Sequence, residues 1–299
     1  MQLKGRKTVQ LVAEEEVYVG LQRDPHEFDV TPEFVTYYSA ATGDQHPWYT
    51  GDSPFGGPVA PALLRHSEVY LFPGWYLSSY GNLHAKQEWE IYHPMMVGDH
   101  VIARCLITDR YSRRGRDYVV NEVTFSDRSG RVLSRGRTHQ SFLRDPAPTA
   151  AVVIDKDREK SAERRFDIPL EGALEELTPL VKPITQEMCD KFSGPIRNYH
   201  NDREEARKLG FPDIVVQGMM PLCFLSELLT RRFGIGWYRG GKMNVSLVNI
   251  VWGSDTVISR GLVRELTPEG SRQRAHLDVW CEKPDGVKVI VGKASAVVA

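Results

Sequence analysis

Three features that would assign the chain to a broad class are missing from its sequence. The 38 basic and 39 acidic residues leave a formal net charge of -1, whereas nucleic-acid-binding proteins usually carry a basic excess. No apolar run approaches the roughly 18 residues of a membrane span, and residues 1–12 lack the apolar core of a signal peptide. These absences predict a cytoplasmic protein that binds neither nucleic acid nor membrane.

Cysteine is scarce, and no glycine-rich nucleotide loop is present. The cysteines are widely spaced, form no C-x-x-C pair and stand in hydrophobic or helical surroundings: Cys105, Cys189, Cys223 and Cys281. We expect buried, reduced thiols rather than a disulfide framework or a metal site. Gly43 and the pair Gly56-Gly57 follow no predicted strand, so we interpret them as turn glycines and not as phosphate loops.

What the sequence does contain is one plan that occurs twice. Its 299 residues, of which 41% are hydrophobic, suffice for two domains of ordinary size. Residues 144–170 are polar and charged with little apolar periodicity, which predicts a linker. The predicted domains are therefore residues 1–143 and residues 171–299.

Each half begins with a capped helix. Thr31 is suited to the N-cap and Pro32 to the first helical position, and Thr185 is the corresponding cap in the second half. Each predicted helix leads into an irregular polar loop, residues 42–49 in the first half and 193–200 in the second.

A Gly/Pro-rich turn then enters a long apolar helix in each half, through residues 53–64 and residues 210–229. The second segment is apolar almost all round, so it should be buried. Strands follow, with hairpin turns predicted at 127–130 and 283–286. Strands segregated behind a helix predict an α+β class of two tandem hot-dog domains, each an antiparallel sheet wrapped around a long central helix.

Three short motifs occur in an order that resembles a known family. They are Gly43-Asp-Gln-His-Pro47, Ser53 to Pro61, and His200 to Ala206 followed by Gly210 to Met219. They resemble, in turn, the GDxNPxH loop, the N-terminal half of fused members and the H-x-D…GF…HGM segment of MaoC-like (R)-specific enoyl-CoA hydratases and hydroxyacyl thioester dehydratases. The similarity covers about 270 residues.

The resemblance implies a chemistry and a set of residues. In that family an Asp and a His five residues later activate water, and a glycine amide polarises the thioester carbonyl. It thus implies a hydro-lyase that interconverts 3-hydroxyacyl and 2-enoyl thioesters of CoA, or of acyl carrier protein, with no cofactor and no metal. Transferred to this chain, the catalytic roles go to His200 and Asp44, and the substrate-binding roles to Gln217, Gly218, Met219 and Tyr49.

Neither half carries the complete Asp/His pair. Tyr49 stands at the His position of the first half, and tyrosine cannot replace a histidine base near pH 7. In the second half, a gapless register puts Pro195 at the Asp position, whereas counting from the helix cap puts Asn198 there and requires a deletion. We prefer the gapless register, which leaves His200 as the only base and places the site in the second half.

Each candidate residue also has a structural interpretation. His200 could bond loop carbonyls, and Asp44 could form a turn or support the opposite half. Asp202 is better explained as the N-cap of a helix that begins at Arg203 than as a catalytic group. Gln217 replaces the family's histidine before Gly218, which leaves the backbone donor in place.

Two other functions remain as alternatives. One is a hot-dog thioesterase, in which Asp44 would activate water. The other is a non-catalytic acyl-thioester-binding or structural subunit, which the incomplete pairs in both halves favour. The basic run from Arg110 to Arg116 predicts a solvated hairpin, with a contact to CoA phosphates as the alternative. The sequence leaves open whether two chains pair as a homodimer.

Overall fold

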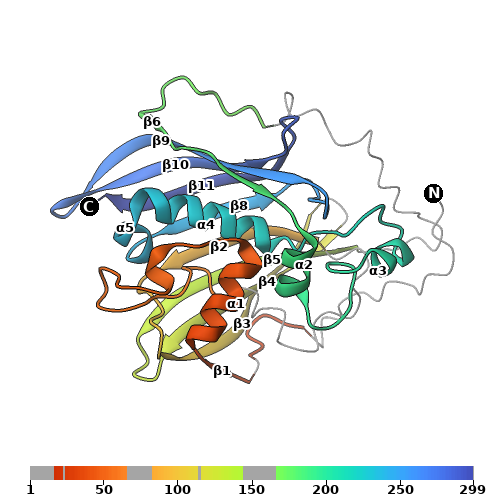
Figure 1. Ribbon diagram of the computed structural model, residues 1–299, viewed down its shortest axis with the longest axis horizontal. Helices are drawn as coiled ribbons and strands as arrows, with labels where there is room; N and C mark the ends of the chain where they lie inside the picture. Colours follow the sequence, from red (N-terminus) through yellow and green to blue (C-terminus); the bar gives the residue numbers. More distant parts are fainter. Residues whose placement is uncertain (1–16, 23, 66–82, 114–115, 144–165, 299) are drawn as a thin grey trace.

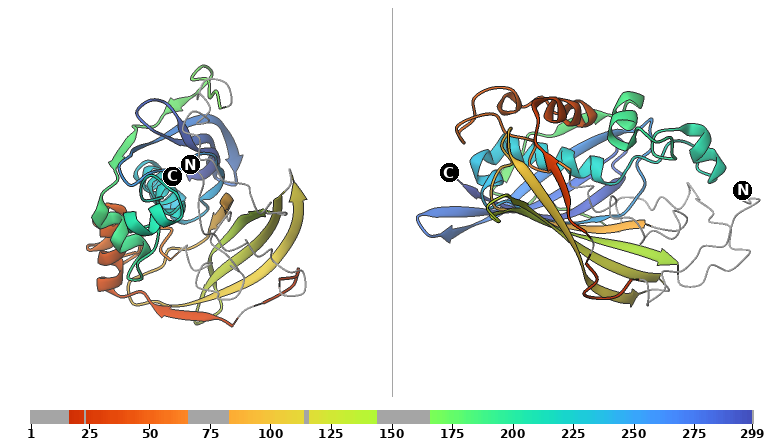
Figure 2. Two further views of the ribbon diagram at one scale, coloured as in Figure 1. Left: turned by 90° about the vertical axis from the view of Figure 1, so that its right-hand side faces the viewer. Right: turned by 90° about the horizontal axis from the view of Figure 1, so that it is seen from below.

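The structure, a computed structural model, describes residues 17–22, 24–65, 83–113, 116–143 and 166–298. Its main element is a large antiparallel sheet with helices on one face (Figure 2). The first half contributes β1 (His26–Asp29), β2 (Leu83–Ile91), β3 (His100–Arg113), β4 (Arg116–Asp127) and β5 (Val132–Leu143). The second half contributes β6 (Glu175–Glu176), β7 (Leu180–Pro183), β8 (Lys242–Leu247), β9 (Thr256–Glu269), β10 (Arg272–Glu282) and β11 (Lys288–Val298). The predicted α+β class is confirmed.

The two expected sheets form a single one. The strand order is β1-β3-β4-β5-β2-β8-β11-β10-β9-β6, with β7 pairing with β9. Antiparallel pairing of β2 with β8, in which Gln87 lies opposite Val245, joins the halves. This junction covers one edge of each half's sheet, and exposed edges favour unwanted pairing with other chains.

The predicted buried helix of the second half is α4 (Met219–Phe233). Its side chains are apolar almost all round, and Met219, Met220 and Phe224 are fully buried. It packs along the strands of the second half (Figure 1) and ends where Gly234 adopts a positive φ of 48°. A helix that is apolar almost all round must be buried, and residues 219–230 of α4 are buried, whereas Arg231 and Arg232 at its end are exposed.

The first half has the Gly/Pro-rich turn that was expected to enter its central helix. Residues 53–65 form turns and one isolated bridge, not a helix. Three prolines, Pro54, Pro58 and Pro61, remove backbone donors there, and Gly56 has a φ of 94°. Residues 66–82, onto which the predicted helix would have continued, lie outside the described residues. A central helix in the first half thus stays a prediction, and α4 is the long buried helix that the described residues contain.

The predicted helix caps are present. The Oγ1 of Thr31 accepts from the amide of Phe34 at the start of α1 (Pro32–Thr42). Thr185 caps α2 (Gln186–Ser193) in the same way. Asp202 accepts from two amides of α3 (Arg203–Lys208), which confirms its interpretation as an N-cap. A short helix, α5 (Ile235–Tyr238), follows α4.

The tandem repeat is visible in matching turns. Asp99 Oδ2 accepts from the amide of Met96 at 2.8 Å, and Asp255 Oδ2 accepts from the amide of Trp252 at 2.7 Å. Met96 pairs with Val59 across an isolated bridge, and Trp252 pairs with Val215 in the same way. The same sequence spacing separates both sets, so Val59 and Val215 are structural counterparts.

Other expectations concern smaller features. All four cysteines are buried as reduced thiols, and hairpins join β4 to β5 and β10 to β11 as predicted. The basic run lies in the hairpin of β3 and β4, whose tip, residues 114–115, is outside the described residues. Most of the predicted linker, residues 144–165, is also outside them. Among the helices that the structure describes, none is long and apolar enough to span a membrane.

We expect Gly292→Ala in β11 to lower the free energy of unfolding by at least about 2 kcal/mol, since overpacking against backbone cannot relax easily. A Cβ there would overlap the carbonyl oxygen of Asn244 and lie 2.6 Å from Cα of Val245. Urea unfolding of the variant and wild type measures the difference. Gly57→Ala is the control, because its Cβ would meet only Met96 Cε, at 3.8 Å; equal losses in both variants would contradict the explanation.

Candidate functional site

The two polar loops can be matched through their backbone hydrogen bonds. The amide of Val59 donates to the carbonyl of Trp48 at 2.9 Å, and that of Val215 donates to the carbonyl of Tyr199 at 3.2 Å. Since Val59 and Val215 are counterparts, Trp48 corresponds to Tyr199. In each half, the polar loop therefore accepts a hydrogen bond from the segment that follows it, and it does so at corresponding residues.

This match supports the gapless register. The next residue in each loop is Tyr49 in the first half and His200 in the second. Counting back five positions places Asp44 opposite Pro195. The first loop therefore has the acid without the imidazole, and the second has the imidazole without the acid.

Asn198, the residue favoured by the other register, acts within the loop. Its Oδ1 accepts from the backbone amide of His200 at 2.8 Å, and its Nδ2 donates to the carbonyl of Ser193 at 2.9 Å. Its amide is thus used to hold the loop, and with it the backbone of His200.

His200 is held as a neutral imidazole. Its Nδ1 lies 2.6 Å from the carbonyl oxygen of Val215. A carbonyl only accepts, so Nδ1 carries the proton and Nε2 presents a lone pair. Within the described chain, no hydrogen bond reaches Nε2. Burial lowers the pKa of His200 to about 4, so the ring is neutral at pH 7. The carbonyl contact expected of a structural histidine is present, and it leaves Nε2 able to act as a base.

Gly218 stands where α4 begins. The first amides of a helix have no partner within it and form the positive end of its dipole. A Cβ on Gly218 would lie 2.5 Å from Leu247 Cδ2 and 3.5 Å from His84 Nδ1, so a side chain would fill this corner. The side chain of Met219 is wholly buried in the core, which leaves its backbone as the group that can face a ligand.

Gln217, immediately before Gly218, has an unsatisfied acceptor. Its Oε1 is buried and no donor among the described residues reaches it. A buried polar atom without a partner costs about 1–3 kcal/mol. A hydroxyl or a water brought in with a ligand would supply the missing donor.

His84, on β2 of the first half, was not identified from the sequence. Its Nε2 lies 3.0 Å from Oε1 of Gln87, and its Nδ1 faces Gly218. A β-bulge between His84 and Lys86 turns it toward this face. The chain holds nine histidines, and no local pattern marks the bulge that distinguishes this one.

The corresponding position in the first half is filled. Oδ2 of Asp44 accepts from the hydroxyl of Tyr49 at 2.6 Å, and its Oδ1 accepts from the amide of His46. Tyr38, Asp44, Tyr49 and Cys223 are among the residues around a cavity of only about 10 Å³. That is room for at most one water, not for an acyl group.

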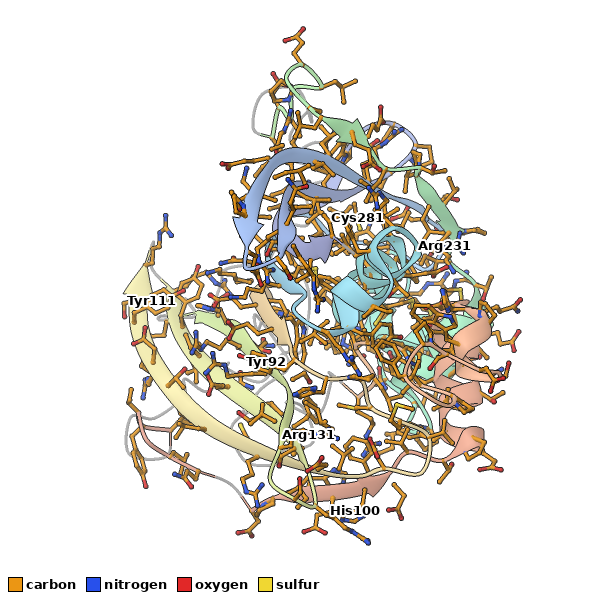
Figure 3. The ribbon with its side chains drawn as sticks, turned by 90° about the vertical axis from the view of Figure 1, so that its left-hand side faces the viewer. Tyr92, His100, Tyr111, Arg131, Arg231 and Cys281 are labelled. Atoms are coloured by element: carbon orange, nitrogen blue, oxygen red, sulfur yellow. The ribbon has the colours of Figure 1, made fainter. Side chains whose placement is uncertain are left out.

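Asp44 belongs to a buried ionic cluster between the halves. Nζ of Lys182 lies 2.7 Å from Oε2 of Glu227 and donates to the carbonyl of Gly43. Arg231 lies on α4 (Figure 3). It donates to Oε1 of Glu227 at 2.6 Å. Burial raises the pKa of both Asp44 and Glu227, and the nearby Asp44 adds to the shift of Glu227.

The predicted site residues therefore fall into two groups. Gln217, Gly218 and Met219 lie where the chain enters α4, and His200 lies on a separate loop that bonds Val215, two residues before Gln217. Asp44 and Tyr49 lie in the ionic cluster, whose Glu227 stands nine residues after Gly218, about 13 Å along the helix axis. The structure brings the first group together and places Asp44 with Tyr49, not with His200.

Comparison with known families gives a match in the first half. Residues 18–135 match the model of the FAS1-like dehydratase domain region. No curated protein matches the chain.

Comparison with solved structures gives the fold of both halves. A MaoC-like dehydratase is 19% identical, with a TM-score of 0.69 and coverage of 95% of this chain and 98% of that one. A Mycobacterium tuberculosis protein with a double hotdog fold is 12% identical, with a TM-score of 0.61 and coverage of 95% and 96%. Drosophila melanogaster peroxisomal multifunctional enzyme type 2 is 17% identical, with a TM-score of 0.59 and coverage of 91% and 48%, so this chain spans about half its length. The double hot-dog fold is confirmed.

We expect Lys182→Met to lower the free energy of unfolding by about 3 kcal/mol, because it removes the buried cation of the cluster and leaves Arg231, which is 57% exposed, to offset the carboxylates. Urea unfolding at pH 7 measures the loss. Lys191→Met is the control, since its pair with Glu187 lies at the surface and should contribute under about 1 kcal/mol. Equal losses in the two variants would show that the buried cluster contributes no more to stability than a surface ion pair.

The low pKa of His200 predicts that stability falls with acidification. The unfolded chain binds a proton at this residue below about pH 6.5, and the folded chain only below about pH 4. Stability is therefore lost as the pH falls through this interval. His200→Asn retains a donor for Val215 but does not titrate, so its unfolding free energy should depend less on pH between 6.5 and 4. Parallel curves for variant and wild type in urea titrations would refute the assignment.

Proposed function

We propose, from the premise that this chain belongs to the MaoC-like hot-dog dehydratase family, that it is a hydro-lyase that interconverts 3-hydroxyacyl and 2-enoyl thioesters. The dehydratase-region match of residues 18–135 and the double hot-dog fold support the reaction class. The observation that carries the assignment is His200, a neutral imidazole whose Nε2 has no hydrogen bond within the described chain, on the loop before the amides of α4.

A single imidazole can perform the hydration. Nε2 of His200 takes a proton from water as the water oxygen bonds to C3 of the enoyl group. The C2=C3 electron pair moves toward C1, and the thioester oxygen becomes negative beside the Gly218 amide and the positive end of the α4 dipole. The enolate then collapses, and C2 takes the proton from the imidazolium. Because its pKa is about 4, this imidazolium returns the proton readily.

The other predicted residues have supporting roles in this scheme. Oε1 of Gln217 would accept from a substrate hydroxyl or a bound water, and Met219 would contribute its backbone. Asp44 and Tyr49 bond each other, which favours support of the opposite half over catalysis for Asp44 and leaves substrate binding by Tyr49 a prediction. CoA rather than acyl carrier protein, a cytoplasmic location and a homodimer remain part of the proposal.

One observation argues against the first alternative function, and another favours the second. A thioesterase would use Asp44 to activate water, but its carboxylate is bonded by Tyr49 beside a cavity of about 10 Å³. A non-catalytic acyl-thioester binder is favoured by Pro195 at the acid position. Turnover by His200 variants separates this alternative from the hydro-lyase.

We expect His200→Asn to lower kcat for hydration by about 10²–10⁴-fold, the usual contribution of a general base. Absorbance of the enoyl thioester band measures turnover on a panel of enoyl-CoAs with straight, branched and aromatic acyl groups. His276→Asn is the matched control. His276 lies on β10 and bonds Thr267 on the neighbouring strand β9, not a residue at the start of α4. If wild type binds these esters and turns over none, the non-catalytic alternative is favoured.

A further inference from the structure

Three polar side chains lie side by side on the core-facing side of the first half's sheet. They come from the neighbouring strands β2, β5 and β4 and stand directly opposite one another: Gln87, Thr138 and Asn121. Val119 and Val123, two residues to either side of Asn121 on β4, belong to the hydrophobic core, and residues two apart on a strand share a face. These three residues, here called the polar row, are all buried.

The second half has an apolar row at the corresponding place. A spacing of 156 residues separates Asp99 from Asp255, the carboxylates of the matching turns. The same spacing relates the polar row to three residues that again lie opposite one another on β8, β11 and β10: Met243, Ala294 and Leu277. All three are core residues, and α4 packs on β10 and β11. The fold therefore does not require polar side chains at these positions.

Two members of the polar row bond each other, and the third is unpaired. Thr138 Oγ1 donates to Oε1 of Gln87 at 2.7 Å, and Nε2 of Gln87 donates to the carbonyl of Glu88. Asn121 is 0% exposed, and within the described chain neither its Oδ1 nor its Nδ2 has a hydrogen-bond partner. A buried amide with both groups unpaired destabilises a fold. Such departures from good packing are expected at functional sites.

The polar row begins beside the start of α4. Nε2 of His84 lies 3.0 Å from Oε1 of Gln87, and Cβ of His84 lies 3.9 Å from the position of a Cβ on Gly218. Neighbouring strands lie about 4.8 Å apart, so Asn121, two strands beyond Gln87, is roughly 10 Å further along the sheet. Oε1 of Gln217, next to Gly218, is buried and unpaired as well. Unpaired amide groups thus lie both at the start of α4 and at the far end of the polar row.

The unpaired groups of Asn121 define the chemistry of a ligand. Oδ1 accepts and Nδ2 donates, so a complementary group must donate and accept at one point, as a hydroxyl does. The polar row carries no charge, and an ion buried there would lack a counter-ion, so the ligand group is neutral. Apolar side chains beside Asn121, from Val119, Val123 and Ile107, suit a hydrocarbon that carries this hydroxyl.

We propose that Asn121 recognises a hydroxyl on the acyl chain of the substrate, far from the thioester, an inference that rests on the proposed function. Asn121 is closed to solvent, so the chain reaches it from the Gly218 end and extends across β2 and β5. There Oδ1 accepts from the hydroxyl and Nδ2 donates to it, which pairs both atoms. An extended chain spans about 1.2 Å per bond, so roughly 10 Å corresponds to about eight bonds. This hydroxyl is therefore distinct from the one that hydration forms at C3.

Asn121→Leu gives the first half the residue of its counterpart, Leu277. The substrates are enoyl-CoAs in pairs that differ by a terminal hydroxyl: hex-2-enoyl-CoA with 6-hydroxyhex-2-enoyl-CoA, and the corresponding pairs with eight and ten carbons. Wild type should prefer the hydroxylated ester in kcat/KM by about 5–10-fold at eight or ten carbons, the value of one hydrogen bond, and show no preference at six. Asn121→Leu should lose the preference by slowing the hydroxylated esters alone. No preference of wild type at any length, or a preference retained in Asn121→Leu, would overturn the inference.

A control variant and urea unfolding separate recognition from a structural role. Thr124→Val changes a residue on the other face of β4 and should keep the preference. Because Asn121 makes no hydrogen bond in the described structure, Asn121→Leu should unfold at the same urea concentration as wild type or at a higher one. A lower midpoint together with equal slowing of both esters of every pair would assign Asn121 a structural role and contradict recognition.

Calorimetry tests the same contact without turnover, with decanoyl-CoA and 10-hydroxydecanoyl-CoA as ligands. If wild type hydrates enoyl-CoAs but treats both members of each pair alike, recognition by Asn121 is wrong and the proposed function stands. If wild type binds the hydroxylated ester more tightly, and Asn121→Leu does not, the recognition stands even where no ester is hydrated and the hydro-lyase proposal fails. If wild type binds neither ester, both proposals are overturned.

Discussion

The edge-to-edge pairing of β2 with β8 is the constraint on which the rest of the molecule depends. It fixes the first half against the second through five antiparallel positions, from Lys86 opposite Ser246 to Glu90 opposite Lys242. Because side chains alternate between faces, a slip of one residue would turn the inward set outward. The same register carries His84 on β2 and Leu247 on β8 to the start of α4, so the proposed site exists only when both halves are joined.

The two halves share one order of helices, loops and strands, and they differ in the residues at the corresponding loop positions. In the first, Tyr49 and Asp44 bond each other beside a cavity of about 10 Å³, and Lys182 crosses from the second half to offset the buried carboxylates. Such a cluster adds little stability over an apolar core of the same shape, although breaking it is costly. It therefore holds the halves in one arrangement, while the second half keeps a histidine that bonds Val215, three residues before Gly218.

Local features could be predicted from the sequence, and long-range ones could not. The caps at Thr31, Thr185 and Asp202 and the burial of α4 follow from neighbouring residues. The Gly/Pro-rich turn before each central helix was also predicted, because prolines and glycines mark it in the local sequence. The union of the sheets, the Lys182–Glu227 pair and the direction of His84 depend on residues distant in sequence. The bulge at Ala85 has no local signal, because any strand residue can occupy it.

The character of His200 explains why positioning matters in this site. Burial holds its pKa at about 4, so at pH 7 the ring is always available as a base but a weak one. A weak base contributes less driving force to proton transfer, and more of the rate must come from a water held in attacking geometry and from donors already aimed at the enolate. A proline at the acid position removes one means of holding that water.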